Sequence, residues 1–277
     1  MIGGIYSLVG VSLALVVGVM DIVNFAHGEL VMLGMYAAFW AIAVLHLPLH
    51  VALILGLPPF YALGILLYKV LVKHIVHQEH STMVFATLGL SMFTQNLILL
   101  FCTGNYKTIT IGGNLSTVFT FWGLRLASVK ILAFLIVLAS TFLFYLFLNK
   151  TFVGKAIKAV SQNPLGAQLV GIDRRWIFCI AFGIGTALAA LAGMLLSLVY
   201  PIYPTVGATF VLIAYVIVIL GGLGSINGAV IGGLIIGLVE AMSGYFLAPN
   251  LKQLVYFVSF LIILLLRPRG LFGQKLQ

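Results

Sequence analysis

The feature that most constrains this chain is a series of long apolar segments that recur along almost its whole length. The candidate spans cover residues 2–20, 26–46, 50–72, 83–103, 128–149, 177–200 and 251–266. Most of them approach the ~20 apolar residues that a helix needs to cross a bilayer core of about 30 Å. A further stretch, 208–247, exceeds one crossing, and a glycine-rich break at 221–228 divides it. We expect a single all-α polytopic transmembrane domain over residues 1–277, with about eight crossings (seven or nine remain open) and two interrupted segments.

Composition excludes the soluble classes. The chain is 63% hydrophobic and 7% charged, whereas soluble domains are about one quarter charged. Little chain remains for an extramembrane catalytic domain. The net charge of +9 comes from basic residues near the ends of apolar segments, which indicates membrane topology rather than a nucleic-acid surface. Cys102 and Cys179 lie inside apolar segments and are interpreted as packing residues. We expect the first apolar segment to be a retained helix rather than a signal peptide.

The distribution of Lys and Arg predicts the orientation. Basic residues follow the third span at Lys69 and Lys73, fill the segment 150–176, and follow the last span from Arg267 onward. Such residues collect on the cytoplasmic side, so we expect these regions and the C-terminus to be cytoplasmic. The loop 104–127 has few charges and should be external, with a short β-hairpin near residues 109–119. Counting the crossings back from Lys73 then puts the N-terminus outside.

Residues 21–34, DIVNFAHGELVMLG, form the first interrupted segment. Ionisable groups between two membrane spans usually mark a pathway or a protein-lined cavity. We expect Asn24 to cap a helix beginning near Phe25, whose free amides would attract an anionic group. The candidate substrate-path residues here are Asn24, Phe25, His27, Gly28 and Glu29. The alternative is an interfacial turn in which Asp21 and Glu29 are solvated by the headgroup region.

Residues 220–237, LGGLGSINGAVIGGLIIG, form the second interrupted segment. The spacing of four between Gly224, Gly228 and Gly232 allows helices to approach closely, and packing alone explains it. Corresponding breaks in two halves of a transporter also indicate a substrate path. The candidate path residues of this break are Gly222, Gly224, Ser225 and Asn227.

The longest polar stretch expected to be cytoplasmic is 152–176. It combines Lys and Arg with an apolar stripe at Ile157, Val160, Leu165, Leu169 and Ile172. The segment is either a basic loop on an anionic membrane surface or an amphipathic helix that docks on a partner.

Two other features concern metal binding and ATP binding. His74, His77 and His80 with Glu79 form a solvated loop more readily than a metal site. The chain has no GxxxxGK[ST] motif, so it holds no P-loop for ATP.

Four stretches, in order, resemble one family. IVNFAHGELVMLGMY, GKAIKAVSQNPLGAQLVGI, LGGLGSINGAVIGGLIIGLVEA and RPRGLFG are similar to hallmark stretches of the H-type permeases of high-affinity branched-chain amino acid ABC importers. The resemblance implies a bacterial inner-membrane complex with a second related permease, two cytoplasmic ATP-binding subunits, and a periplasmic or lipid-anchored binding protein. It implies no cofactor, metal, nucleic acid or enzymatic activity in this chain itself. On this pattern an ATPase subunit sits on a coupling loop that contains Gly154, Lys155, Ala156, Asn163, Gly166, Ala167 and Gly171.

Other functions remain open from the residues. An ion-coupled secondary transporter would use the membrane-level acids Asp21, Glu29 and Glu240. Close relatives of the family carry urea or short amides, so the substrate is open as well. An intramembrane enzyme lacks a credible nucleophile and base.

Overall fold

The computed structural model describes the whole chain except residues 110–117, 122–123, 247–251, 268–269 and 273–277. The helices of its first half are α1 (Ile2–Met20), α2 (His27–Phe39), α3 (Leu49–Leu67), α4 (Lys73–Ile75) and α5 (His80–Cys102). Short π-helical stretches continue α2 as η1 (Trp40–Val44) and α3 as η2 (Tyr68–Val72). The second half has α6 (Ser128–Lys150), α7 (Phe152–Gln162), α8 (Pro164–Leu169), α9 (Arg174–Leu196), α10 (Val206–Gly221), α11 (Ile226–Phe246) and α12 (Lys252–Leu266).

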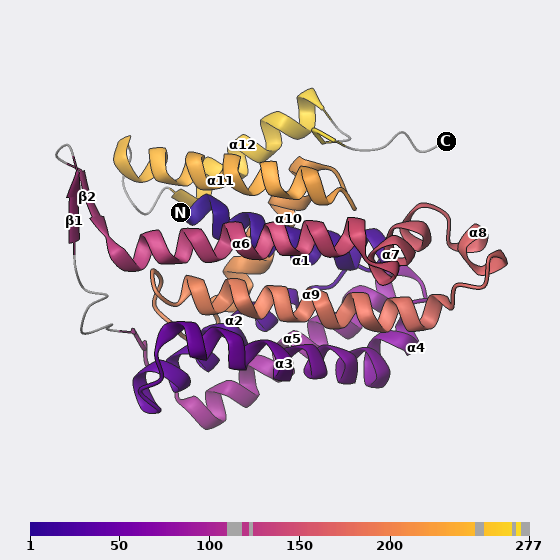
Figure 1. Ribbon diagram of the computed structural model, residues 1–277, viewed down its shortest axis with the longest axis horizontal. Coiled ribbons are helices and arrows are strands. Elements are labelled where there is room, and N and C mark those ends of the chain that lie inside the picture. Colours follow the sequence, from indigo (N-terminus) through magenta and orange to yellow (C-terminus); the bar gives the residue numbers. More distant parts are fainter. Residues whose placement is uncertain (110–117, 122–123, 247–251, 268–269, 273–277) are drawn as a thin grey trace.

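The described residues contain seven helices that are long and apolar enough to cross a membrane, and the shorter apolar α10 adds an eighth. Most of them lie lengthwise along the molecule (Figure 1). The expected all-α polytopic membrane fold is therefore confirmed. The second break is narrower than expected, because α10 continues to Gly221 and α11 begins at Ile226.

Helix α1 lies at the centre of the bundle, where it packs against α9, α10 and α11. In its most apolar window, 83% of the residues are buried. Small residues allow the close approach that holds the bundle together. A Cβ on Gly18 would come 2.8 Å from the Cα of Gly224, and one on Gly193 of α9 would collide with the carbonyl oxygen of Val31 in α2.

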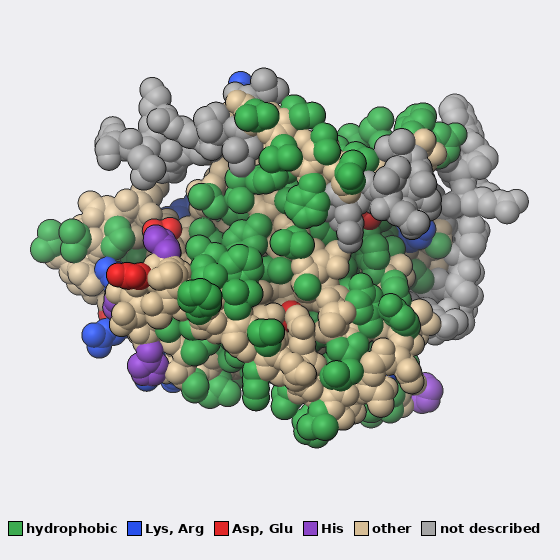
Figure 2. Space-filling view, turned by 180° about the vertical axis from the view of Figure 1, so that it is seen from behind, with side chains coloured by type: hydrophobic (Ala, Val, Ile, Leu, Met, Phe, Trp, Pro, Cys, Tyr) green, Lys and Arg blue, Asp and Glu red, His purple; other side chains and the backbone are tan. Residues whose placement is uncertain are grey.

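Charged residues gather at one end of the molecule. The helices α4, α7 and α8 lie there, while the N-terminus and a β-hairpin lie at the opposite end (Figure 1). In Figure 2 most Lys, Arg and His atoms lie towards one end, and the middle of this face is mainly hydrophobic. At the charged end Arg174 Nη2 contacts His77 Nδ1 at 3.2 Å. The basic segments thus share one end, as the sequence predicted, and the N-terminus lies at the other.

The loop between α5 and α6 contains the expected hairpin, but later in the sequence. Strand β1 (Val118–Phe121) pairs antiparallel with β2 (Leu124–Ala127). The expected segment near 109–119 lies mostly outside the described residues. Upstream of the hairpin, Lys107 bridges to Ile202 through the backbone. The Lys107 ammonium group also lies 5.0 Å from the ring centroid of Phe39. This contact anchors the loop to the C-terminal end of α2.

Candidate functional site

The first break carries the chain back into the bundle after α1 ends. Asp21 adopts the left-handed conformation (φ 52°), and the chain runs without helical structure to His27. Asn24 is buried, and its Oδ1 accepts a hydrogen bond from the Ala26 N–H at 3.1 Å. The expectation that Asn24 is the N-cap is therefore wrong. Helix α2 begins at His27, two residues after the expected Phe25, and Ala26 takes the N-cap position. The Asn24 side chain stabilises the turn before the helix instead.

His27 begins α2 fully buried against the middle of α1. Its Nε2 lies 2.9 Å from Ser12 Oγ. Ser12 uses its single hydroxyl proton to donate to the Val9 carbonyl oxygen at 2.7 Å. Ser12 Oγ must therefore accept from His27, which places a proton on Nε2. His27 Nδ1 has no hydrogen-bond partner.

Glu29 lies in the first turn of α2 and is 1% exposed. Its Oε1 accepts hydrogen bonds from Ser91 Oγ at 3.0 Å and from Gln95 Nε2 at 2.7 Å. Its Oε2 is buried without a partner. The carboxylate fits only because Gly207, at the start of α10, has no side chain: a Cβ there would come 2.5 Å from Oε2. Glu29 is not solvated, so the interfacial-turn alternative is wrong for this residue, although Asp21 is exposed.

The residues that bond Glu29, and the stripe to which they belong, were not predicted from the sequence. Thr87, Ser91 and Gln95 lie four residues apart on α5 and form one polar stripe. Thr87 Oγ1 also accepts from the Phe25 N–H at 3.2 Å. The spacing of four was visible in the sequence, but nothing in the sequence indicates which segment the stripe contacts.

The second break lies against the end of α1. Gly222 (φ 101°) and Gly224 (φ 75°) take backbone conformations that favour glycine. The Ser225 hydroxyl accepts from the Gly228 N–H at 3.1 Å and so caps α11. Asn227 is exposed. Since Gly224 contacts Gly18, which immediately precedes the first break, the structure brings the two breaks to the same end of α1.

The C-terminal segment covers this break. Backbone N–H groups of Leu271 and Phe272 donate to the carbonyl oxygens of Leu220 and Gly221, at 2.8 and 3.0 Å. These carbonyls end α10 and would otherwise have no helical partner.

The expected coupling segment forms two helices whose apolar residues face different ways. Ile157 and Val160 of α7 are buried against the bundle, whereas Leu165 and Leu169 of α8 are 70% and 89% exposed. The single apolar stripe was therefore wrong, because the turn at Asn163, whose side chain caps α8, redirects the chain.

The expected coupling residues fall into a buried group and a more exposed group. Gly154, Ala156 and Ala167 are buried within this chain. A Cβ on Gly154 would collide with the Phe147 carbonyl oxygen. Lys155, Asn163 and Gly171 are exposed, and Gly166 is half-buried.

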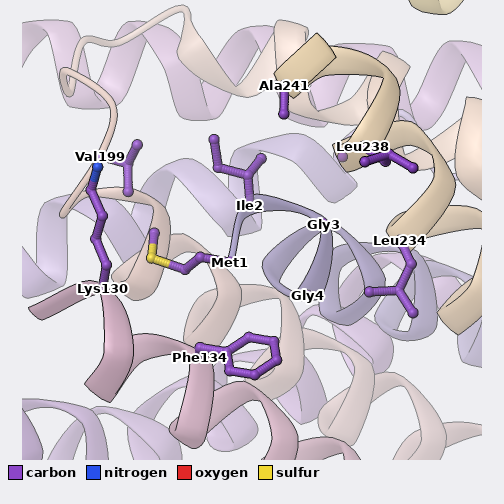
Figure 3. A pocket seen from close by; sticks show the side chains of 11 residues that line it. Met1, Ile2, Gly3, Gly4, Lys130, Phe134, Val199, Leu234, Leu238 and Ala241 are labelled. Atoms are coloured by element: carbon purple, nitrogen blue, oxygen red, sulfur yellow. The ribbon is translucent and has the colours of Figure 1, made fainter. Parts of the chain in front are cut away.

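A cavity of about 360 Å³ lies apart from both breaks. It opens at the N-terminal end of α1, between α6 and α11, and Lys130 and Phe134 reach it from α6 (Figure 3). Since none of the candidate path residues lines it, the cavity gives no support to the expected path. Among the described residues, no cluster of His, Cys, Asp or Glu could hold a metal ion.

A third buried polar group joins α1 to α11. Glu240 is 4% exposed and accepts a hydrogen bond from the Tyr200 hydroxyl at 2.6 Å. Tyr200 also contacts the Tyr6 hydroxyl at 3.2 Å. The start of α10 lies beside Glu29, which Gly207 contacts, and Phe210 of the same helix packs against Tyr200. The positive end of that helix stabilises a negative charge on Glu29.

Comparison with known proteins identifies the family. The family model described as branched-chain amino acid transport system / permease component matches residues 1–265. The high-affinity branched-chain amino acid transport system permease protein BraD of Pseudomonas aeruginosa is 31% identical, over 99% of this chain and 93% of its own length. LivH of Escherichia coli is 30% identical over 99% and 92%, and a probable LivH of Methanocaldococcus jannaschii is 32% identical over 91% and 84%. No solved structure matches. The resemblance drawn from the four sequence stretches is confirmed: the chain belongs to the permease-component family of branched-chain amino acid transport systems.

Proposed function

We propose that this chain is the membrane-spanning permease subunit of an ABC importer that translocates leucine, isoleucine and valine by alternating access. The permeases named above support the substrate class. The observation that carries the proposal is the buried polar break at the start of α2. Asn24, His27 and Glu29 all lie inside the bundle. His27 and Glu29 are in the first turn of α2, which begins next to the middle of α1. Discontinuous helices of this kind form the binding sites of many transporters.

The break suits a zwitterionic substrate. The start of α2 is the positive end of the helix dipole and attracts a carboxylate. Glu29 Oε2, which has no partner, provides an acceptor for an ammonium group. An amino acid presents both groups on adjacent atoms.

The energy for transport comes from partner ATPases in this proposal, since the chain has no P-loop. Helix α8 provides the docking surface. Leu165, Leu169 and Val170 are 70%, 89% and 76% exposed at the charged end of the molecule, and such an apolar patch fits a groove on a partner. That end, with the C-terminus, faces the cytoplasm, and the second permease and the binding protein complete the complex.

The experiment compares two preparations in proteoliposomes: the chain alone with an ion gradient, and the chain with its permease, ATPase and binding-protein partners with ATP. We expect uptake of labelled leucine in the complex only. Accumulation by the chain alone would overturn the proposal in favour of a secondary transporter that uses Glu29 or Glu240. Competition by urea or acetamide, with none by valine, would show that the substrate is an amide.

The docking surface is tested by Leu169→Asp. Because Leu169 is exposed, we expect uptake and substrate-stimulated ATP hydrolysis by the complex to fall at least about tenfold, while the stability of the permease changes by no more than about 0.5 kcal/mol. Gln162→Asp makes the same charge change on the same segment, at an exposed residue outside the patch, and should behave as the wild type. Equal activity of the two variants would show that α8 is not the coupling surface.

A further inference from the structure

Helix α5 has apolar residues on its outward face and polar residues on its inward face, the opposite of a surface helix in a soluble protein. Only 11% of its most apolar window is buried, compared with 78% in α9. Its outward face carries large apolar residues such as Phe85, Met92 and Phe93. Its buried residues include Thr87 and Ser91, and Gln95 continues the same face one turn later. The polar stripe of Thr87, Ser91 and Gln95 therefore points inward, away from lipid, whereas Asn96 lies on the exposed face.

This stripe attaches α5 to the first break through hydrogen bonds. Ser91 and Gln95 donate to Glu29 Oε1, and Thr87 accepts from the Phe25 N–H. The Thr87 hydroxyl also bonds carbonyl oxygens of its own helix. The helices against which α5 packs are α2 and the short α4.

Two helices held together by hydrogen bonds can exchange these bonds for bonds to another molecule more readily than two helices held by apolar packing. An interlocked apolar seam loses its packing when it opens, whereas each polar group can find an equivalent hydrogen bond on a bound molecule. The same carboxylate has a second acceptor without a partner, because Glu29 Oε2 is buried beside Gly207 of α10.

We propose that Thr87, Ser91 and Gln95 form the detachable wall of the substrate path. In this structure Ser91 and Gln95 donate to Glu29, and Thr87 accepts from the Phe25 N–H. When α5 separates from α2, the substrate enters the seam and takes over their hydrogen bonds. Its ammonium group binds the Glu29 carboxylate, and its carboxylate accepts hydrogen bonds from the Ser91 hydroxyl and the Gln95 amide.

This inference rests on the proposed function for the identity of the substrate, an α-amino acid. The opening of the seam does not depend on that identity. The two parts therefore need separate measurements.

The first measurement is the kinetics of leucine uptake by the reconstituted complex. Gln95→Leu keeps the side-chain size but removes the amide, so we expect kcat/KM to fall about tenfold, mainly through a higher KM, as for the loss of one hydrogen bond to a charged group. Gln95→Asn should partly restore it. The matched control is Asn96→Leu on the exposed face, whose amide bonds only the Met92 carbonyl of its own helix, and it should stay within about twofold of the wild type. An unchanged KM in Gln95→Leu would overturn the substrate contact.

The second measurement is thiol labelling of Gln95→Cys in a complex whose chain also carries Cys102→Ala and Cys179→Ala. A small hydrophilic thiol reagent should label position 95 at least tenfold faster in one of two states, nucleotide-free or ATP-bound. Asn96→Cys should label at the same slow rate in both. Equal rates at position 95 would show that the seam does not open. If the wild-type complex takes up no leucine, the proposed function fails, and the labelling still decides whether α5 moves.

Discussion

The hydrogen bond between Ser12 and His27 should be a measurable determinant of stability. Both side chains are buried, and Ser12 Oγ is the acceptor for the His27 Nε2–H at 2.9 Å. His27 Nδ1 already lacks a partner, so Ser12→Ala leaves the whole imidazole without a hydrogen bond to a side chain. An unsatisfied buried group costs about 1–3 kcal/mol, and we expect the free energy of unfolding to fall by that amount.

The assay is reversible unfolding of the purified protein in bicelles, with a double-mutant cycle. Replacing both partners by apolar groups removes the unsatisfied donor, so Ser12→Ala with His27→Leu should be less destabilised than the sum of the single variants, with a coupling of about 0.5–3 kcal/mol. Ser140→Ala is the control, because the Ser140 hydroxyl bonds only the Ile136 carbonyl of its own helix. If Ser12→Ala destabilises no more than Ser140→Ala, the Ser12–His27 hydrogen bond does not contribute to stability and the prediction is refuted.

Two further predictions concern packing. Gly193→Val places a side chain against the Val31 backbone, and we expect a loss of about 1–3 kcal/mol or more in unfolding free energy, whereas Gly89→Ala, where a Cβ meets nothing within 4 Å, should be neutral or slightly stabilising; equal effects would contradict the close approach of α2 and α9. Ala167→Arg should destabilise α8 because Ala167 is 4% exposed, and faster proteolysis of the α7–α8 segment would show this.

The membrane spans could be predicted from the sequence because the thickness of the bilayer fixes their length. The span expected at 128–149 is α6, Ser128–Lys150. The break after α10 was predicted because consecutive glycines interrupt an apolar run. The sequence also indicated that Asn24, His27 and Glu29 are functional candidates, since ionisable groups at membrane level require a reason.

The remaining features depend on contacts between distant segments. The sequence predicts residues 83–103 as an apolar span, and only the position of the first break gives the stripe its partners, Glu29 for Ser91 and Gln95 and the Phe25 N–H for Thr87. The apolar residues of α7 and α8 have similar chemistry, so the sequence cannot tell Ile157, which packs on its own bundle, from Leu169, which is exposed. Helix α2 begins later than predicted because the polar turn extends through Ala26.

The central place of α1 has a consequence for biosynthesis. Its packing partners α9, α10 and α11 lie about 150 to 200 residues further along the chain. At a translation rate of ~5–20 residues per second, α1 remains in the bilayer for roughly 10–40 s before α11 is made. During that time lipid, a chaperone or the translocon must cover the face that carries Ser7, whose hydroxyl donates to the Val230 carbonyl oxygen of α11. A nascent chain that stops before α11 would therefore leave this hydroxyl without its partner, and a quality-control protease that recognises polar groups within the bilayer would have a signal to read.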